Sequence, residues 1–109
     1  MHELSIAESV VDAVLERTGD RHVATVRLQV GRLSGVVPDA LMFCFELATA
    51  GTALEDADLQ IQEPTGRAHC RECNMDFALN DLILLCECGS ADVEVVAGRE
   101  LSVSSVEVA

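Results

Sequence analysis

Residues 68–90 read AHCRECNMDFALNDLILLCECGS, and this stretch carries four cysteines in two close pairs. Cys70 and Cys73 form a C-x2-C pair, twelve residues follow, and Cys86 and Cys88 form a C-x-C pair. Zinc prefers four ligands in a tetrahedron, and two short turns bring thiolates together at little entropic cost. The spacing therefore predicts a structural Zn(II) site made of these four cysteines.

The second pair is one residue shorter than the usual C-x2-C turn, so its sulfurs must come from a tighter turn. Gly89 follows Cys88 directly and tolerates the backbone φ that such a turn requires. The neighbouring His69 could replace a badly placed thiolate, which leaves a site of three cysteines and one histidine open. The same spacing is also compatible with two disulfides, with free thiols or with a redox-active Cys70-x-x-Cys73 pair.

The rest of the sequence favours a reducing environment. The chain begins Met1-His2-Glu3-Leu4, without the basic segment and apolar run of a signal peptide and without a stretch long enough to span a membrane. We therefore expect a cytoplasmic protein, in which structural disulfides are rare. A fifth cysteine, Cys44, lies in an apolar segment and is expected to be a buried, inert core thiol.

The composition limits the class of partner. Half of the 109 residues are apolar, which is enough for the core of one small domain with a metal-stapled insert. Nineteen acidic against seven basic residues give a net charge of −12, which repels phosphate backbones. We therefore expect no nucleic-acid partner and no membrane partner.

Hydrophobic periodicity predicts the elements around the cysteine segment, with helical spacing for helices and strict alternation for strands. In chain order we expect a helix over 5–18, a strand over 24–30, a helix over 38–50, a strand over 58–62, a zinc ribbon over 66–98 and a strand over 101–108. This order predicts an α+β fold with two helices packed on a three-stranded sheet and an inserted zinc-ribbon module. The domains are expected at 1–65 with 99–109, and at 66–98.

Local signals refine these boundaries. Ser5 followed by Glu8 predicts a capping box at the start of the first helix. Pro38 suits the first turn of the second helix. The apolar phase of the last strand slips between Ser104 and Ser105, which predicts a β-bulge there.

The first residues form a second candidate metal site. The large side chain of His2 should prevent removal of Met1, which leaves a free α-amine. That amine, the backbone nitrogen and imidazole of His2, and the backbone nitrogen of Glu3 can close chelate rings around one metal ion. Ni(II) and Cu(II) favour this tetragonal arrangement, whereas Zn(II) does not. We expect Met1–Leu4 to lie outside the first helix, free to wrap a metal; a solvated histidine without a ligand role is the competing interpretation.

Short motifs along the chain resemble those of the HypA/HybF family of nickel metallochaperones for hydrogenase maturation. Besides the cysteine pairs, they are Met1-His2-Glu3-Leu4-Ser5, Val30-Gly31-Arg32-Leu33-Ser34, Gly98-Arg99-Glu100-Leu101 and Ser105-Val106-Glu107-Val108. The cysteine spacing alone is generic. An N-terminal Met-His-Glu in the same short chain is the specific part of the resemblance.

The resemblance implies a protein that is not an enzyme, binds Ni(II) weakly as cargo and holds Zn(II) structurally. The partners it implies are a maturation GTPase and the large subunit of [NiFe]-hydrogenase, and in some bacteria urease maturation proteins. Nickel then falls to Met1, His2 and Glu3, and zinc to the four paired cysteines. Asp39 matches an acidic position beside the nickel site. The short C-x-C turn departs from the family pattern and puts the zinc geometry in question.

Two other functions compete with this interpretation. A zinc-ribbon adaptor would recognise a protein partner and would be indifferent to nickel, so a nickel titration with a His2 variant distinguishes it. A zinc enzyme needs an open coordination position, which four cysteines close. His22 has no Cys or Ser partner in the sequence and is expected at the surface.

Overall fold

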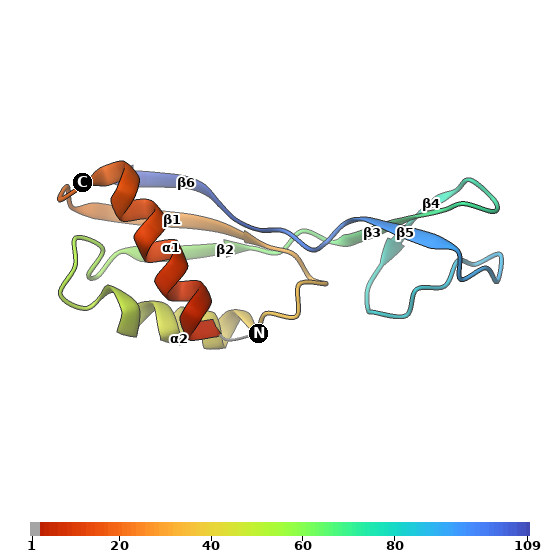
Figure 1. The fold of residues 1–109 in the computed structure, drawn as a ribbon, viewed down its shortest axis with the longest axis horizontal. Helices are drawn as coiled ribbons and strands as arrows, with labels where there is room; N and C mark the ends of the chain where they lie inside the picture. The colour runs from red at the N-terminus through yellow and green to blue at the C-terminus, as the bar shows by residue number, and fades with distance from the viewer. Residues whose placement is uncertain (1–2) are drawn as a thin grey trace. The chain divides into compact units, whose positions relative to one another are not determined.

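The fold consists of two helices and two small sheets, described over residues 3–109 by a computed structural model. Along the chain the elements are α1 (Glu3–Thr18), β1 (Val23–Val30), α2 (Pro38–Thr49), β2 (Asp58–Gln62), β3 (Gly66–Cys70), β4 (Asp76–Leu79), β5 (Val93–Ala97) and β6 (Leu101–Val108). The strands are hydrogen-bonded in the orders β2-β1-β6 and β4-β3-β5 (Figure 1). The predicted α+β fold, with the ribbon strands inserted between β2 and β6, is confirmed.

The described chain divides into two compact units. The first holds the residues up to Leu28 together with Val36–Ile61 and Ser102–Ala109. The second holds Gln29–Gly35 and Gln62–Leu101. The domain boundaries expected from the sequence, 1–65 with 99–109 and 66–98, stay a prediction.

In the first unit, α1 and α2 pack against each other and cover one face of the sheet (Figure 1). Each helix buries an apolar stripe at helical spacing, and β1 buries alternate residues against it. The buried residues of these three elements include Ala7, Val11, Val14, Val26, Leu28, Val30, Leu41 and Phe45. Cys44 lies on the flank of the α2 stripe and is half-buried, so its prediction as a buried core thiol is wrong, whereas its lack of reactivity stays a prediction. Across residues 3–109, neither helix has the length and apolar character needed to cross a membrane.

α1 includes residues that the sequence placed outside it. Glu3 lies in its first turn, where an acidic side chain interacts favourably with the helix dipole. Ser5 is therefore inside the helix, and the predicted capping box with Glu8 is wrong. The expectation that Met1–Leu4 lie outside the helix is wrong for Glu3 and Leu4, and the two residues before them fall outside the described part of the chain.

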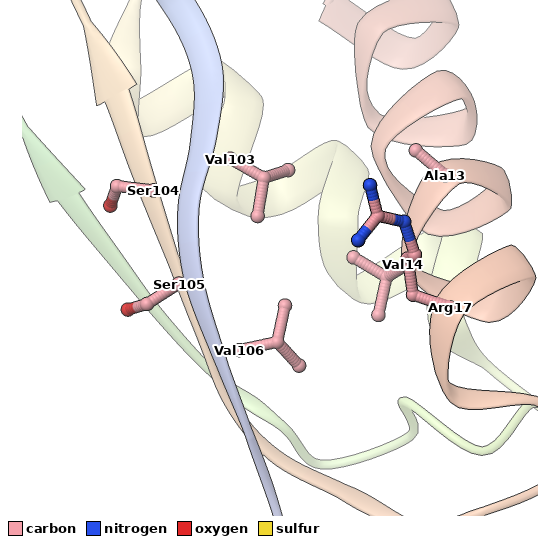
Figure 2. Close-up of a pocket in the computed structure, with 7 residues that line it drawn as sticks. All are labelled: Ala13, Val14, Arg17, Val103, Ser104, Ser105 and Val106. Atoms are coloured by element: carbon pink, nitrogen blue, oxygen red, sulfur yellow. The ribbon is translucent and has the colours of Figure 1, made fainter.

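The apolar phase of β6 slips at the predicted place. Val103 and Val106 face α1, whereas Ser104 and Ser105 both lie on the other side of the strand (Figure 2). There the Ser104 hydroxyl donates to the carbonyl of Arg27 at 3.2 Å, and the Ser105 hydroxyl accepts from its guanidinium at 3.3 Å. Two consecutive side chains on one face are what a β-bulge produces.

Glycines pack closely in the second unit. The Leu33 N–H donates to the Gly98 carbonyl at 2.7 Å, and the Gly31 N–H donates to the Glu100 carbonyl at 2.8 Å. A Cβ on Gly31 would overlap the Gly98 carbonyl oxygen, and a Cβ on Gly66 would lie 2.6 Å from Leu33 Cδ1. Gly98 itself has a φ of 107°, a conformation that favours glycine. The strand exit at Gly31 and the return at Gly98 thus meet in a contact that leaves no room for side chains.

Candidate metal centre

The first cysteine pair lies on a tight turn that follows β3. The Asn74 N–H donates to the Cys70 carbonyl at 2.9 Å, and the Cys70 N–H donates to the Met75 carbonyl at 2.9 Å. Asn74 has a φ of 60°, which asparagine tolerates better than most side chains do. These bonds fix the turn that carries Cys70 and Cys73.

The second pair lies on a turn of the tight kind that its C-x-C spacing predicts. The Cys86 N–H donates to the Ser90 carbonyl, and the Gly89 N–H donates to the Cys86 carbonyl, both at 2.9 Å. Gly89 has a φ of 91°, and a Cβ there would meet no neighbour within 4 Å. The glycine is therefore needed for its backbone conformation, as predicted.

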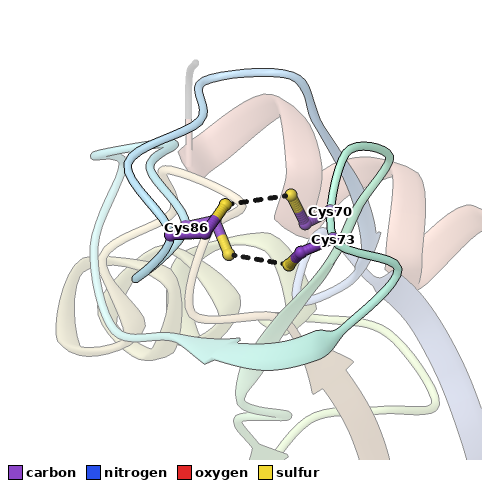
Figure 3. Close-up of side chains that lie close together, drawn as sticks. Cys70, Cys73 and Cys86 are labelled. Atoms are coloured by element: carbon purple, nitrogen blue, oxygen red, sulfur yellow. Dashed lines mark hydrogen bonds between the residues drawn. The ribbon is translucent and has the colours of Figure 1, made fainter.

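The two turns direct their sulfurs toward one another. Cys70 Sγ lies 3.7 Å from Cys88 Sγ. Cys73 Sγ lies 3.6 Å from Cys86 Sγ, and Figure 3 shows these two side chains facing each other beside Cys70. All four sulfurs lie within 4.8 Å of each other, and none forms a disulfide. Zn–S bonds of about 2.3 Å in a tetrahedron place the sulfurs about 3.8 Å apart. The cluster therefore fits a tetrahedral thiophilic metal ion, and a pair of disulfides does not describe it.

His69 does not join this cluster. Its Nδ1 lies 2.6 Å from Asp76 Oδ1, across the antiparallel pair that β3 forms with β4. Among residues 3–109, the four cysteines are the ones gathered closely enough to share a metal ion. The structure thus favours the all-cysteine site over the one with histidine.

The protonation of the cluster favours a bound cation. The Cys73 backbone N–H donates to the Cys70 sulfur and lowers the pKa of Cys70 to about 7. The Ser90 backbone N–H acts to lower the pKa of Cys88, but the Cys86 thiol and burial outweigh it and raise this pKa to about 12. The Cys70 thiolate therefore forms readily, whereas the raised pKa of Cys88 means that this thiol needs a nearby cation to lose its proton near neutral pH.

Polar contacts that the sequence reasoning missed support the two turns. The Arg71 guanidinium forms an ion pair with Asp92 at 2.9 Å, and the Arg71 N–H donates to the Asp92 carbonyl at 3.0 Å. The Asp92 N–H in turn donates to the Ser90 hydroxyl at 3.0 Å. Ser90-Ala91-Asp92 is a local turn signal that could have found the last contact, whereas the Arg71 pair joins segments 21 residues apart.

The N-terminal candidates are described only in part. Met1 and His2 lie outside the described residues. The Glu3 carboxylate accepts a long hydrogen bond, 3.4 Å, from the N–H of Val37, the residue before α2. Asp39 lies in the first turn of α2. The hydrogen bond between Glu3 and Val37 therefore joins the N-terminal ends of α1 and α2, which carry Glu3 and Asp39. Nothing in the sequence pattern predicts the link.

Comparison with known proteins supplies the family. The family model for "Hydrogenase/urease nickel incorporation, metallochaperone, hypA" matches residues 1–108. Hydrogenase maturation factor HypA of Streptomyces avermitilis is 51% identical over 97% of this chain and 86% of its own, and that of Geotalea uraniireducens is 45% identical over 99% of each. The solution structure of the Ni metallochaperone HypA from Helicobacter pylori has the same fold, with a TM-score of 0.70, 24% identity, and coverage of 99% of this chain and 97% of that one. The chain therefore belongs to the HypA family, whose members are metallochaperones of nickel incorporation and not enzymes.

Proposed function

We propose that this protein binds Ni(II) through Met1, His2 and Glu3 and delivers it in the cytoplasm for the maturation of [NiFe]-hydrogenase. Its partners are then a maturation GTPase and the hydrogenase large subunit, with urease maturation proteins as further recipients. The observation that carries the proposal is the match of residues 1–108 to a nickel-incorporation family. It is supported by the donors of the N-terminal sequence.

The start of α1 suits a nickel ligand at Glu3. The first N–H groups of a helix have no hydrogen-bond partner inside the helix. Metal binding at the Glu3 amide would therefore break no hydrogen bond of α1. Ni(II) binds backbone nitrogen after displacing its proton, and the positive end of the helix dipole stabilises the negative charge that remains. The position of Glu3 inside α1 is therefore compatible with a planar nitrogen site, although the sequence placed it outside.

The four cysteines hold Zn(II) in a different role in this proposal. When bound, the ion would supply four strong bonds to sulfur that fix the two turns. The four thiolates would occupy all of its coordination positions. Cys70, Cys73, Cys86 and Cys88 would hold it, and Arg71 and Ser90 would keep the turns in place. A tightly held ion cannot serve as cargo, so the two metals are separated by function.

Nickel titration of the untagged, zinc-loaded protein tests the carrier role. We expect about one Ni(II) per chain, and His2→Ala should weaken the affinity by more than about a hundredfold, because even supporting residues of a metal site cost about 10–100-fold. His22→Ala is the matched control, since His22 is an exposed histidine in the turn before β1. Equal affinities of the two variants would mean that the protein is a zinc-ribbon adaptor or takes nickel elsewhere.

The nickel affinity should also fall on acidification. The amine and imidazole bind only when deprotonated, and the ordinary pKa of histidine is about 6.5. We expect more than about a tenfold loss of affinity between about pH 7.5 and about pH 5.5. Isothermal calorimetry in buffers of different ionisation enthalpy measures the protons released together with the affinity. A pH-independent affinity would count against His2 as a ligand.

A further inference from the structure

A groove of about 380 Å³ lies between α1 and β6 in the first unit (Figure 2). Ala13 and Val14 line it from the helix, and Val103 and Val106 line it from the strand. The two serines between these valines also line the groove, but their side chains point to the opposite side, so they contribute backbone. The groove therefore has an apolar floor and the main chain of β6 along one wall.

β6 is an edge strand whose protection is limited to the bulge at Ser104–Ser105 and the single charge of Glu107. The order β2-β1-β6 leaves one side of β6 without a strand partner among the described residues. Proteins commonly protect such edges with lysine, with proline or by keeping the strand short. The eight residues of β6 contain no Lys, Arg or Pro, whereas the other edge strand, β2, has five residues and is followed closely by Pro64. β6 can therefore accept a further strand.

Arg17 stands at the rim of the same groove and reaches from α1 toward β6 (Figure 2). Within residues 3–109, its guanidinium forms no ion pair and no hydrogen bond. Its place in the last turn of α1 suits the helix dipole, but that role does not require a side chain over the groove. An unpaired cation beside an apolar groove complements a single carboxylate, whereas a polyacidic segment would be repelled by the net charge of −12.

We propose that this groove binds an extended segment of a partner protein by β-strand addition to β6. Main-chain hydrogen bonds to β6 supply affinity, and alternate apolar side chains of the segment enter the groove. One carboxylate of the segment pairs with Arg17. Among residues 3–109, neither Glu3 nor any of the cysteines lines the groove, so the proposal does not rest on either metal site.

A peptide experiment on the full, zinc-loaded chain tests this binding mode. The probe is a pool of blocked heptapeptides in which Val, Ile or Leu alternates with Thr, and Glu occupies one of the apolar positions. Hydrogen exchange should slow in β6 when the pool is added, and fluorescence polarisation of a retained member gives its affinity. N-methylation of alternate peptide nitrogens should abolish binding, because it removes the donors of β-pairing.

Charge variants test the role of Arg17. Arg17→Gln should weaken binding by about threefold to fivefold, the upper part of the range of an exposed ion pair, and replacement of the peptide Glu by Gln should weaken it equally. Arg21→Gln is the matched control, because Arg21 is exposed and does not line the groove. Arg17→Glu should in turn prefer a peptide with Lys in place of Glu.

Several results would overturn the proposal. The proposal is wrong if the protein retains no peptide from the pool, or if it retains N-methylated peptides as well. It is also wrong if Arg17→Gln binds the peptide as tightly as wild type, or if the peptide slows hydrogen exchange outside β6 instead of in it. If β6 is already protected in the free protein and sedimentation shows a concentration-dependent dimer, the occupant is a second copy of this chain and the proposal is wrong.

Discussion

Removal of the proposed zinc ion will unfold the strands β3 to β5 and leave α1, α2 and the first sheet folded. The second unit has a small core: its buried apolar cluster contains Leu33, Ala68 and Leu79, with a few half-buried neighbours. Structural zinc contributes about 10–16 kcal/mol in small metal-dependent domains, far more than such a core supplies. We therefore expect hydrogen exchange in β3–β5 to reach the rate of an unfolded chain after chelation, while β1 and α2 keep their protection.

Cys73→Ser should have the same effect without a chelator, because it removes one of the four thiolates. Cys44→Ser is the matched control: Cys44 is half-buried, belongs to the first unit and lies outside the cluster. Elemental analysis should find about one zinc per chain in the control and little in Cys73→Ser. Full protection of β3–β5 in zinc-free protein would show that the thiols are not a structural metal site.

Gly98→Ala will strongly destabilise the second unit. A Cβ on Gly98 would lie 2.6 Å from Gly66 Cα and 3.1 Å from Leu33 Cδ1, and the φ of 107° is strained for any side chain. Strain and overlap each cost about 1–3 kcal/mol, so we expect a loss of about 2–6 kcal/mol in the free energy of unfolding. Urea denaturation of the zinc-loaded protein, followed by hydrogen exchange in β3 and β5, measures it.

Gly35→Ala separates the two contributions. Gly35 has a φ of 80° in the same unit, but a Cβ there would meet nothing within 4 Å. We expect this variant to lose only about 1 kcal/mol, the conformational cost alone. Equal losses at the two positions would mean that the close packing around Gly98 does not contribute to stability.

The features that the sequence predicted well are local. The cysteine spacing, the tight turn at Gly89 and the alternation of helices and strands each depend on residues a few positions apart. The start of α1 was placed wrongly because Ser5 and Glu8 match a capping box that the acidic first turn at Glu3 makes unnecessary. Cys44 shows the same limit, since an apolar neighbourhood in sequence does not say which flank of a helix a side chain occupies.

The features that the sequence could not supply join distant segments. From the sequence alone His69 is a plausible ligand, whereas the structure pairs it with Asp76 across β3 and β4. The motifs around Gly31 and Gly98 carry the resemblance to a family, but their physical reason is a close backbone contact between segments that lie far apart in the sequence. Arg27 likewise forms an ion pair with Glu107, 80 residues away, and the hydrophobic periodicity of the sequence does not predict it.

The position of the insert has a consequence for the newly made chain. Because β6 follows the cysteine turns in chain order, the ribosome releases all four thiols before the first sheet can receive its third strand. Folding during synthesis proceeds from the N-terminus, and the distant pairing of β6 is the slow step. The order of the elements therefore allows the proposed zinc site to fill while the first unit is still incomplete, before the part that would handle the proposed cargo is assembled.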